Sequence, residues 1–154
     1  MALREKIEDD LKTALKAGDK QRLSCLRMVK AKVQEKQIEL RSKEGPEAKL
    51  SEEDVANVVS AYAKQRRDSI DSYEKGGRED LAANERAELE ILTEYLPQQM
   101  SEEEIAEIVD DAVKESGASA PKDMGAVMKL VMPKVKGRAD GKIVNRIVQS
   151  RLKG

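Results

Sequence analysis

Apolar residues recur every three or four positions along most of the chain, which is the spacing of one face of an α-helix. The first stripe predicts a helix over residues 3–17 that ends at Gly18, and Asp19 can cap the helix that follows. Three more helices are predicted before Pro97, over about residues 20–42, from a cap at Ser51 to Gly76-Gly77, and from about Arg78 to Leu96.

Pro97 stops the fourth predicted helix, and we place a domain boundary there, between residues 1–97 and 98–154. Beyond it, Ser101 and Glu104 have the spacing of a full capping box. Three further helices are predicted, the first ending at Gly117, the second starting at Pro121 and ending or kinking at Pro133, and the third capped by Asp140. The pattern predicts an all-α fold, with a helical N-terminal domain of about four helices and a small C-terminal bundle of about three.

The composition restricts what the core can contain. Hydrophobic residues make up 39% of the chain, but Phe and Trp are absent and only three Tyr are present. The core must therefore be aliphatic, and aliphatic residues at helical spacing favour a helix bundle over a β-sandwich. No run approaches the roughly 18 apolar residues that span a bilayer, and the N-terminus carries no apolar signal region. We expect a soluble, cytoplasmic protein without a membrane partner.

The absence of histidine excludes several kinds of chemistry. Histidine is the usual general base near neutral pH and the commonest zinc ligand, and this chain has none. Cys25 is the only cysteine, so it can form neither an intrachain disulfide nor a Cys–His pair, and we expect it to be a small core residue. The acids that open the predicted helices at residues 52–54 and 102–104 suit the helix dipole better than they suit catalysis. The sequence therefore indicates no catalytic residue, no cofactor and no metal site.

The net charge of −1 hides a very uneven distribution. Residues 85–119 hold 2 basic and 11 acidic side chains, whereas residues 121–154 hold 9 basic and 2 acidic ones. Residues 12–43 are also basic, with 10 cations against 3 acids. Basic regions near both ends thus flank an acidic predicted helix.

The densest basic stretch surrounds the predicted start of the last helix, and its four cations are Lys134, Lys136, Arg138 and Lys142. A helix N-terminus offers free N–H groups and a positive dipole end, so this stretch is a candidate binding site for an anion such as an RNA phosphate. No aromatic residue follows Tyr95 to stack on bases, so RNA contacts would be made to the backbone. In the simpler interpretation, Gly137 and Gly141 shape a turn, Asp140 occupies the helix N-terminus and the cations are merely solvated.

A second polar group is predicted inside the N-terminal half. Arg66 lies near the apolar stripe of its helix, and Glu85 and Glu88 lie on the next helix. We expect an interhelix polar contact among them, structural rather than functional.

Several motifs together resemble the YqeY-like proteins over essentially the whole chain. They are Leu26-Arg27-Met28, Gln65-Arg66-Arg67-Asp68-Ser69, Tyr73-Glu74-Lys75-Gly76-Gly77-Arg78, Tyr95-Leu96-Pro97, Asp123-Met124-Gly125, Met132-Pro133-Lys134 and Lys136-Gly137-Arg138-Ala139-Asp140-Gly141. That family shares its C-terminal domain with the tail of the B subunit of the glutamine-dependent Asp/Glu-tRNA amidotransferase, a helical tail that helps to hold tRNA. The resemblance also implies the family's label of carbon–nitrogen ligase with glutamine as amido-N-donor.

The chemistry of that enzyme has no counterpart in these residues, because neither a Ser–Ser–Lys nucleophile arrangement nor an ATP and metal site is recognisable. Three hypotheses follow. The first is a non-catalytic protein that docks tRNA or another structured RNA through the four cations around residues 134–142. The second is glutamine-dependent amide transfer, so whether the chain is an enzyme stays open. The third is a protein–protein adaptor, in which the acidic helix 101–115 and the basic tail contact other chains.

Overall fold

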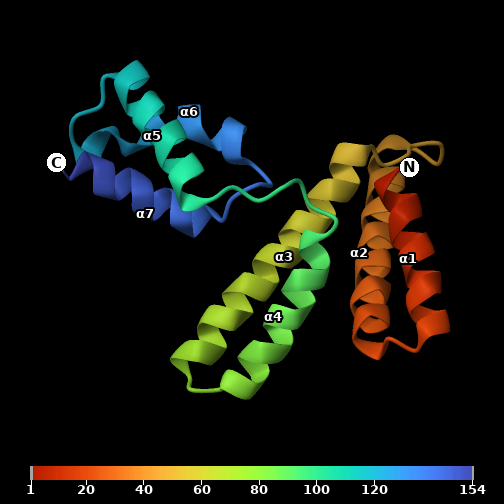
Figure 1. Cartoon of the computed structure of the whole chain (residues 1–154). Helices are drawn as coiled ribbons and strands as arrows, with labels where there is room; N and C mark the ends of the chain where they lie inside the picture. Colours follow the sequence, from red (N-terminus) through yellow and green to blue (C-terminus); the bar gives the residue numbers. More distant parts are fainter. Residues whose placement is uncertain (1, 154) are drawn as a thin grey trace. The chain divides into compact units, whose positions relative to one another are not determined.

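A computed structural model describes residues 2–153, and within that range every regular element is a helix. The elements are α1 (Leu3–Ala17), α2 (Lys20–Glu44), α3 (Glu52–Lys75), α4 (Glu79–Thr93), α5 (Glu102–Ser116), the short 3₁₀ helix η1 (Pro121–Asp123), α6 (Met124–Val135) and α7 (Gly141–Leu152) (Figure 1). The all-α prediction is confirmed. The chain divides into two compact units, Met1–Leu96 and Pro97–Gly154.

Local capping sets the helix starts in the first unit. The Asp19 carboxylate accepts a hydrogen bond from the backbone N–H of Arg22 at the start of α2, as predicted. Ser51 and Asp54 form a complete capping box at the start of α3, each side chain accepting from the other residue's backbone N–H. Gly18 ends α1 with a φ of 70°, a left-handed conformation that glycine adopts without a steric penalty.

The core of the first unit is aliphatic and draws on all four helices. Figure 1 shows α1 beside α2 and α3 beside α4, two helical hairpins that share this core. Its fully buried members include Leu26 from α2, Val59 from α3 and Leu92 from α4. Gln37, the buried polar residue of α2, donates to the carbonyl oxygen of Ala48 at 2.8 Å and thereby holds the α2–α3 loop against the helix.

The fourth helix is shorter than predicted, ending at Thr93 rather than at Leu96. The N–H groups of Glu94, Tyr95 and Leu96 bond carbonyls three residues back, which tightens the last turn. This turn directs Tyr95 into the core, where its hydroxyl donates to Asp10 of α1 at 2.5 Å. A contact across 85 residues therefore decides the end of α4.

The second unit packs α5, α6 and α7 around its own valine-rich core, to which Val109, Val131 and Val148 contribute. The Ser101 side chain accepts a hydrogen bond from the backbone N–H of Glu104, as the predicted capping box requires. The return bond, from the Ser101 N–H to the Glu104 side chain, is not formed among the described residues. Gly117 ends α5 with a φ of 70°, as expected.

The prediction for Pro133 is corrected in part, because α6 does not end there but continues to Val135. Proline removes one backbone donor. The buried side chains of Val131 and Val135, which flank it one turn apart on the core side, keep the last turn helical. Among residues 2–153, no helix is both long and apolar enough to cross a membrane.

Candidate functional site

The four cations predicted to bind an anion lie on one connection, which we call the basic turn (residues 134–142). It comprises the last residues of α6, a non-helical turn and the first residues of α7. Lys134 is in the final turn of α6, Lys136 caps that helix, Arg138 lies in the turn, and Lys142 is the second residue of α7. The structure therefore brings all four together within one short segment.

Hydrogen bonds inside the basic turn define its path. The backbone N–H groups of Arg138 and Ala139 both bond the carbonyl oxygen of Val135, at 2.9 and 3.1 Å. Gly137 has a φ of 76°, a left-handed value that a residue with a side chain adopts at a cost. Since Val135 is fully buried, the turn is attached directly to the core of the second unit.

A second segment, residues 97–100, fastens the basic turn from outside; we call it the clamp segment. The N–H of Met100 donates to the carbonyl oxygen of Arg138 at 2.8 Å, and the Gln99 side-chain amide donates to that of Gly137 at 3.1 Å. In return, Nε of Arg138 donates to the carbonyl oxygen of Gln98 at 3.0 Å. These bonds connect the turn to the clamp segment, and they orient Arg138.

Sequence reasoning missed the clamp segment. Its residues are about forty positions from their partners, and Gln98 and Gln99 carry no local signal of pairing. The only hint was their place directly after Pro97, where a helix cannot continue.

The two lysines at the end of α6 are available to a ligand. Lys134 and Lys136 are exposed, and within residues 2–153 neither takes part in an ion pair. Arg138 is half-buried because of its bond to the clamp segment. Lys142 is exposed in the first turn of α7.

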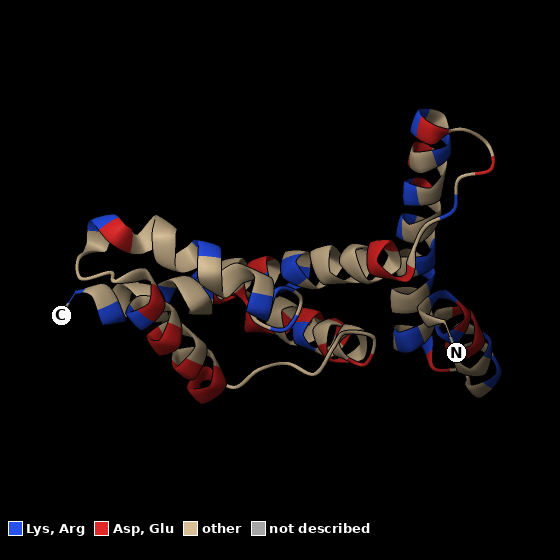
Figure 2. Cartoon of the chain, turned by 90° about the horizontal axis from the view of Figure 1, so that it is seen from above, with Lys and Arg blue, Asp and Glu red and all other residues tan. Residues whose placement is uncertain are grey.

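Other cations of the second unit are neutralised by α5. Arg146 and Arg151 of α7 pair with Glu102 and Asp110 of α5 at 2.5 and 2.7 Å. Figure 2 shows the acids gathered on α5, most densely over its first turn. Part of the positive charge of residues 121–154 is therefore engaged within the unit. Among the described residues, Lys122, Lys129 and Lys153 are likewise exposed and outside any ion pair, so the basic turn is distinguished by the close spacing of its cations.

The N-terminus of α7 is occupied by its own cap. The Asp140 carboxylate accepts from the N–H of Lys142 at 3.0 Å, as predicted. An anion would therefore be bound by the cations of the basic turn more than by free N–H groups of the helix.

The predicted contact of Arg66 is present in the first unit. One of its terminal nitrogens lies 2.8 Å from Glu85 and 3.3 Å from Glu88, and the guanidinium stacks 4.9 Å from the ring centre of Tyr62. All of these groups are largely buried, and Nε of Arg66 is buried without a partner. The arrangement joins α3 to α4 and offers no nucleophile.

Cys25 lies in the same core, fully buried as expected. Burial, together with the nearby Glu88 carboxylate, raises the pKa of the thiol to about 12. Because the thiolate is the reactive form, this cysteine is chemically inert near neutral pH.

The chain is thus a two-unit, all-helical protein, and its C-terminal bundle carries a cationic turn that is hydrogen-bonded to the clamp segment. The family model described as Yqey-like protein matches residues 4–152. The chain belongs to the YqeY-like family.

Three relatives illustrate the range of similar proteins. The E subunit of the glutamyl-tRNA(Gln) amidotransferase of Saccharolobus solfataricus is 34% identical over 119 residues, which cover 74% of this chain and 18% of that protein. The protein of Pyrenophora tritici-repentis named "Altered inheritance of mitochondria protein 41, mitochondrial" is 26% identical over 147 residues. The alignment covers 94% of this chain and 77% of that protein. Its counterpart from Saccharomyces cerevisiae (strain YJM789) is 28% identical over 136 residues, 88% of this chain and 69% of that protein.

The alignment with the amidotransferase relative is longer than residues 97–154, so the similarity includes part of the first unit. The chain spans less than a fifth of that relative's length.

Proposed function

We propose that this protein is a non-catalytic docking protein for structured RNA, tRNA in particular, and that the basic turn is its contact surface. The observation that carries the proposal is the pair of exposed, unpaired lysines, Lys134 and Lys136, beside Arg138 on a turn that the clamp segment already holds in place. The similarity to part of a glutamyl-tRNA(Gln) amidotransferase supports tRNA as the RNA.

The chemistry of the basic turn indicates how RNA would be held. Lysines act as point charges toward phosphate, whereas Arg138 can add a directional contact with the donors that do not face Gln98. With no aromatic residue after Tyr95, base stacking has no platform in this unit. We therefore expect salt-sensitive binding with little sequence preference.

The test is a salt titration of tRNA binding, measured by fluorescence anisotropy. Replacing Lys134, Lys136, Arg138 and Lys142 by Ala should weaken binding and flatten the log–log salt slope by about 3, if each cation neutralises one phosphate. The matched control replaces four exposed cations of the same unit that lie off the basic turn: Lys114, Lys122, Lys129 and Lys153. It changes the charge equally and should leave the slope nearly unchanged.

Arg138→Ala also removes the bond to Gln98, so a variant that keeps Arg138 and replaces only the three lysines separates charge from bracing. Equal binding by the basic-turn variant and the charge-matched control would show that the basic turn is not the RNA surface. Circular dichroism before each titration confirms that the compared variants are folded.

We also propose a cytoplasmic location. The fungal relatives have mitochondrial in their names, so fractionation of cells that express the chain with a small C-terminal tag is the direct measurement. Recovery of the protein with mitochondria would contradict the proposal.

A further inference from the structure

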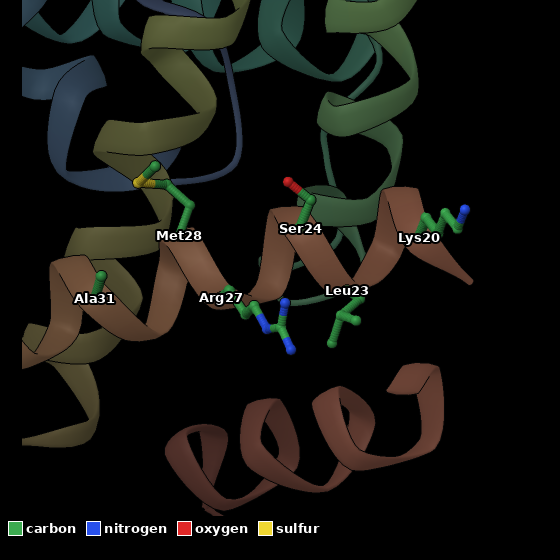
Figure 3. Close-up of a pocket in the computed structure, with 6 residues that line it drawn as sticks. All are labelled: Lys20, Leu23, Ser24, Arg27, Met28 and Ala31. Atoms are coloured by element: carbon green, nitrogen blue, oxygen red, sulfur yellow. The ribbon is translucent and has the colours of Figure 1, made fainter. Parts of the chain in front are cut away.

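The outward face of α2 is a second candidate surface, independent of the basic turn. A hollow of about 410 Å³ lies on it, lined by Lys20, Leu23, Ser24, Arg27, Met28 and Ala31. These positions form two adjacent rows with steps of three and four, 20-23-27-31 and 20-24-28-31, and so make up a single helix stripe. Figure 3 shows the six side chains on α2, with Leu23 and Arg27 on one side of the stripe and Ser24 and Met28 on the other.

The stripe lies opposite the buried side of its helix. Cys25, Val29 and Val33 face the core, about half a helical turn away from Arg27 and Ala31. The outward face nevertheless carries apolar side chains: Met28 is 47% exposed, and Ile38, on the same stripe, is 61% exposed. A helix with apolar residues on both faces is typically covered on both. The described residues cover only one face of α2.

The charge of this stretch points to the kind of partner. Residues 20–38, the length of the stripe, hold six cations and one acid, Glu35. Three of these cations have partners within the fold: Arg22 with Glu94 at 2.5 Å, Lys36 with Glu39 at 3.1 Å, and Lys32 over the ring of Tyr62. Lys20 and Arg27, the two on the outward stripe, have no ion pair with any described residue.

The first turn of α2 carries fewer acids than the first turns of three other helices. Helices α3, α4 and α5 begin with acids that complement the positive end of the helix dipole, but the first turn of α2 contains no acid. It begins instead with Lys20 and, two residues on, Arg22. The Asp19 cap carboxylate already lies at the positive end of the dipole, and Arg22 pairs with Glu94. Lys20 is therefore the charge at this end of α2 that an acidic ligand would offset.

We propose that the outward face of α2 docks an amphipathic helix of another protein, whose apolar side chains are flanked by Asp and Glu. Leu23, Met28, Ala31 and Ile38 would bury the apolar side of that helix, while Lys20 and Arg27 would pair with its carboxylates. From Lys20 to Ile38 the stripe is about 27 Å long at 1.5 Å per residue, enough for about five turns of a partner helix.

A protein helix fits this face better than RNA or a second copy of the chain. Phosphates would leave the exposed apolar side chains of Met28 and Ile38 uncovered. A second copy related by a two-fold axis through the middle of the stripe would place two unpaired Arg27 guanidiniums against each other. Neither problem arises with an acidic amphipathic helix. The inference does not rest on RNA binding by the basic turn.

The experiment uses the full chain and two synthetic helical peptides of about 18 residues, long enough to follow the stripe. The peptides share one leucine stripe, flanked by Glu in the first and by Lys in the second. We expect the Glu peptide to bind about tenfold or more tightly than the Lys peptide, because the face repels like charge. The double variant Lys20→Glu/Arg27→Glu should reverse that preference, and Met28→Asp should weaken the binding of the Glu peptide.

The matched control is Lys122→Glu/Lys129→Glu, which makes the same charge change at exposed positions of the other unit and should leave the preference intact. Equal affinity for the two peptides, or a preference that the double variant does not reverse, would overturn the proposal. So would a larger loss of tRNA binding in the double variant than in this control, which would assign the face to RNA. Sedimentation showing a dimer that Met28→Asp dissociates would assign it to a second copy.

Discussion

At the scale of single residues, burial and partners decide what each ionisable or reactive side chain can do. The thiol of Cys25 and the guanidinium of Arg66 could react or bind ligands on a surface, but both lie largely buried in the first unit. Lys134 and Lys136 are ordinary lysines, and their proposed role in binding rests on the lack of an ion-pair partner among the described residues. Chemical identity alone therefore does not distinguish functional from structural residues in this chain.

The thiol of Cys25 gives a direct test of burial. Because its pKa is raised to about 12, mainly by burial, the thiolate is scarce at pH 8 and the folded protein should react with iodoacetamide far more slowly than the unfolded protein. The control is Cys25→Ser/Ser24→Cys, which moves the thiol to the more accessible neighbouring position. Mass spectrometry of the timed reaction measures both rates. Equal labelling of the wild type and the control under native conditions would contradict the buried position.

At the scale of elements, each helix depends on a local cap and on one buried stripe. The caps of α2, α3 and α7 use a side chain within three residues of the N–H that they bind. The stripes of α4 and α6 are held by the cores of their own units. Removing a cap should therefore lower the free energy of unfolding less than opening a cavity in a core does.

Leu92 of α4 tests the core contribution. It is fully buried, so Leu92→Ala should lower the free energy of unfolding by about 2–4 kcal/mol through lost burial and the cavity left behind. Leu15→Ala makes the same truncation at a side chain that is 55% exposed and should cost much less. Urea unfolding followed by circular dichroism measures both. Similar losses for the two variants would mean that the buried face of α4 is wrongly assigned.

Asp140 tests the capping contribution at the basic turn. Asp140→Ala removes the acceptor of the Lys142 N–H and should cost about 1 kcal/mol of stability. Asp111→Ala, at an exposed position inside α5, is the comparison. Because Asp140→Ala also removes a negative charge from the basic turn, tRNA binding should strengthen slightly or stay unchanged. A marked loss of tRNA binding at unchanged helicity would mean that the cap carboxylate itself contributes to binding.

At the scale of the whole molecule, two separate cores carry two different candidate surfaces. The cores of residues 1–96 and 97–154 share no buried residue among those described. The basic turn belongs to the second unit and the outward face of α2 to the first. A protein that holds RNA with one unit and a protein helix with the other would act as a bridge between the two. This role differs from the adaptor hypothesis, which placed its contacts on helix 101–115 and the basic tail.

The separate cores predict that residues 97–154 fold alone. We expect this fragment to be helical and to melt cooperatively by circular dichroism, because all the hydrogen bonds of the clamp segment and the basic turn described above lie within it. Val109→Asp in the fragment, at a fully buried position, should abolish the transition. A fragment that is unfolded or melts without a transition would show that the second unit needs the first.

Local interactions explain why the sequence predicted the helices well. Asp19, Ser51, Gly117 and Asp140 each stop or start a helix through bonds to neighbours a few residues away, and these are visible in the sequence itself. The apolar stripes indicated the buried faces for the same reason, since helical spacing alone puts those residues on one side. Arg66 could be paired with Glu85 and Glu88 because α3 and α4 form one hairpin.

The tertiary structure decided whatever depends on residues far apart in the chain. It ended α4 at Thr93 by directing Tyr95 toward Asp10, and it continued α6 past Pro133 because Val131 and Val135 are buried. It also separated the cations that are neutralised, such as Arg146 by Glu102, from Lys134 and Lys136, which stay available on the basic turn. The sequence by itself determined the helices, their caps and their buried faces, because those depend on short-range spacing. Apart from the contact of Arg66 between the neighbouring helices α3 and α4, only folding determined which charges meet, because an ion pair depends on where distant helices place their side chains.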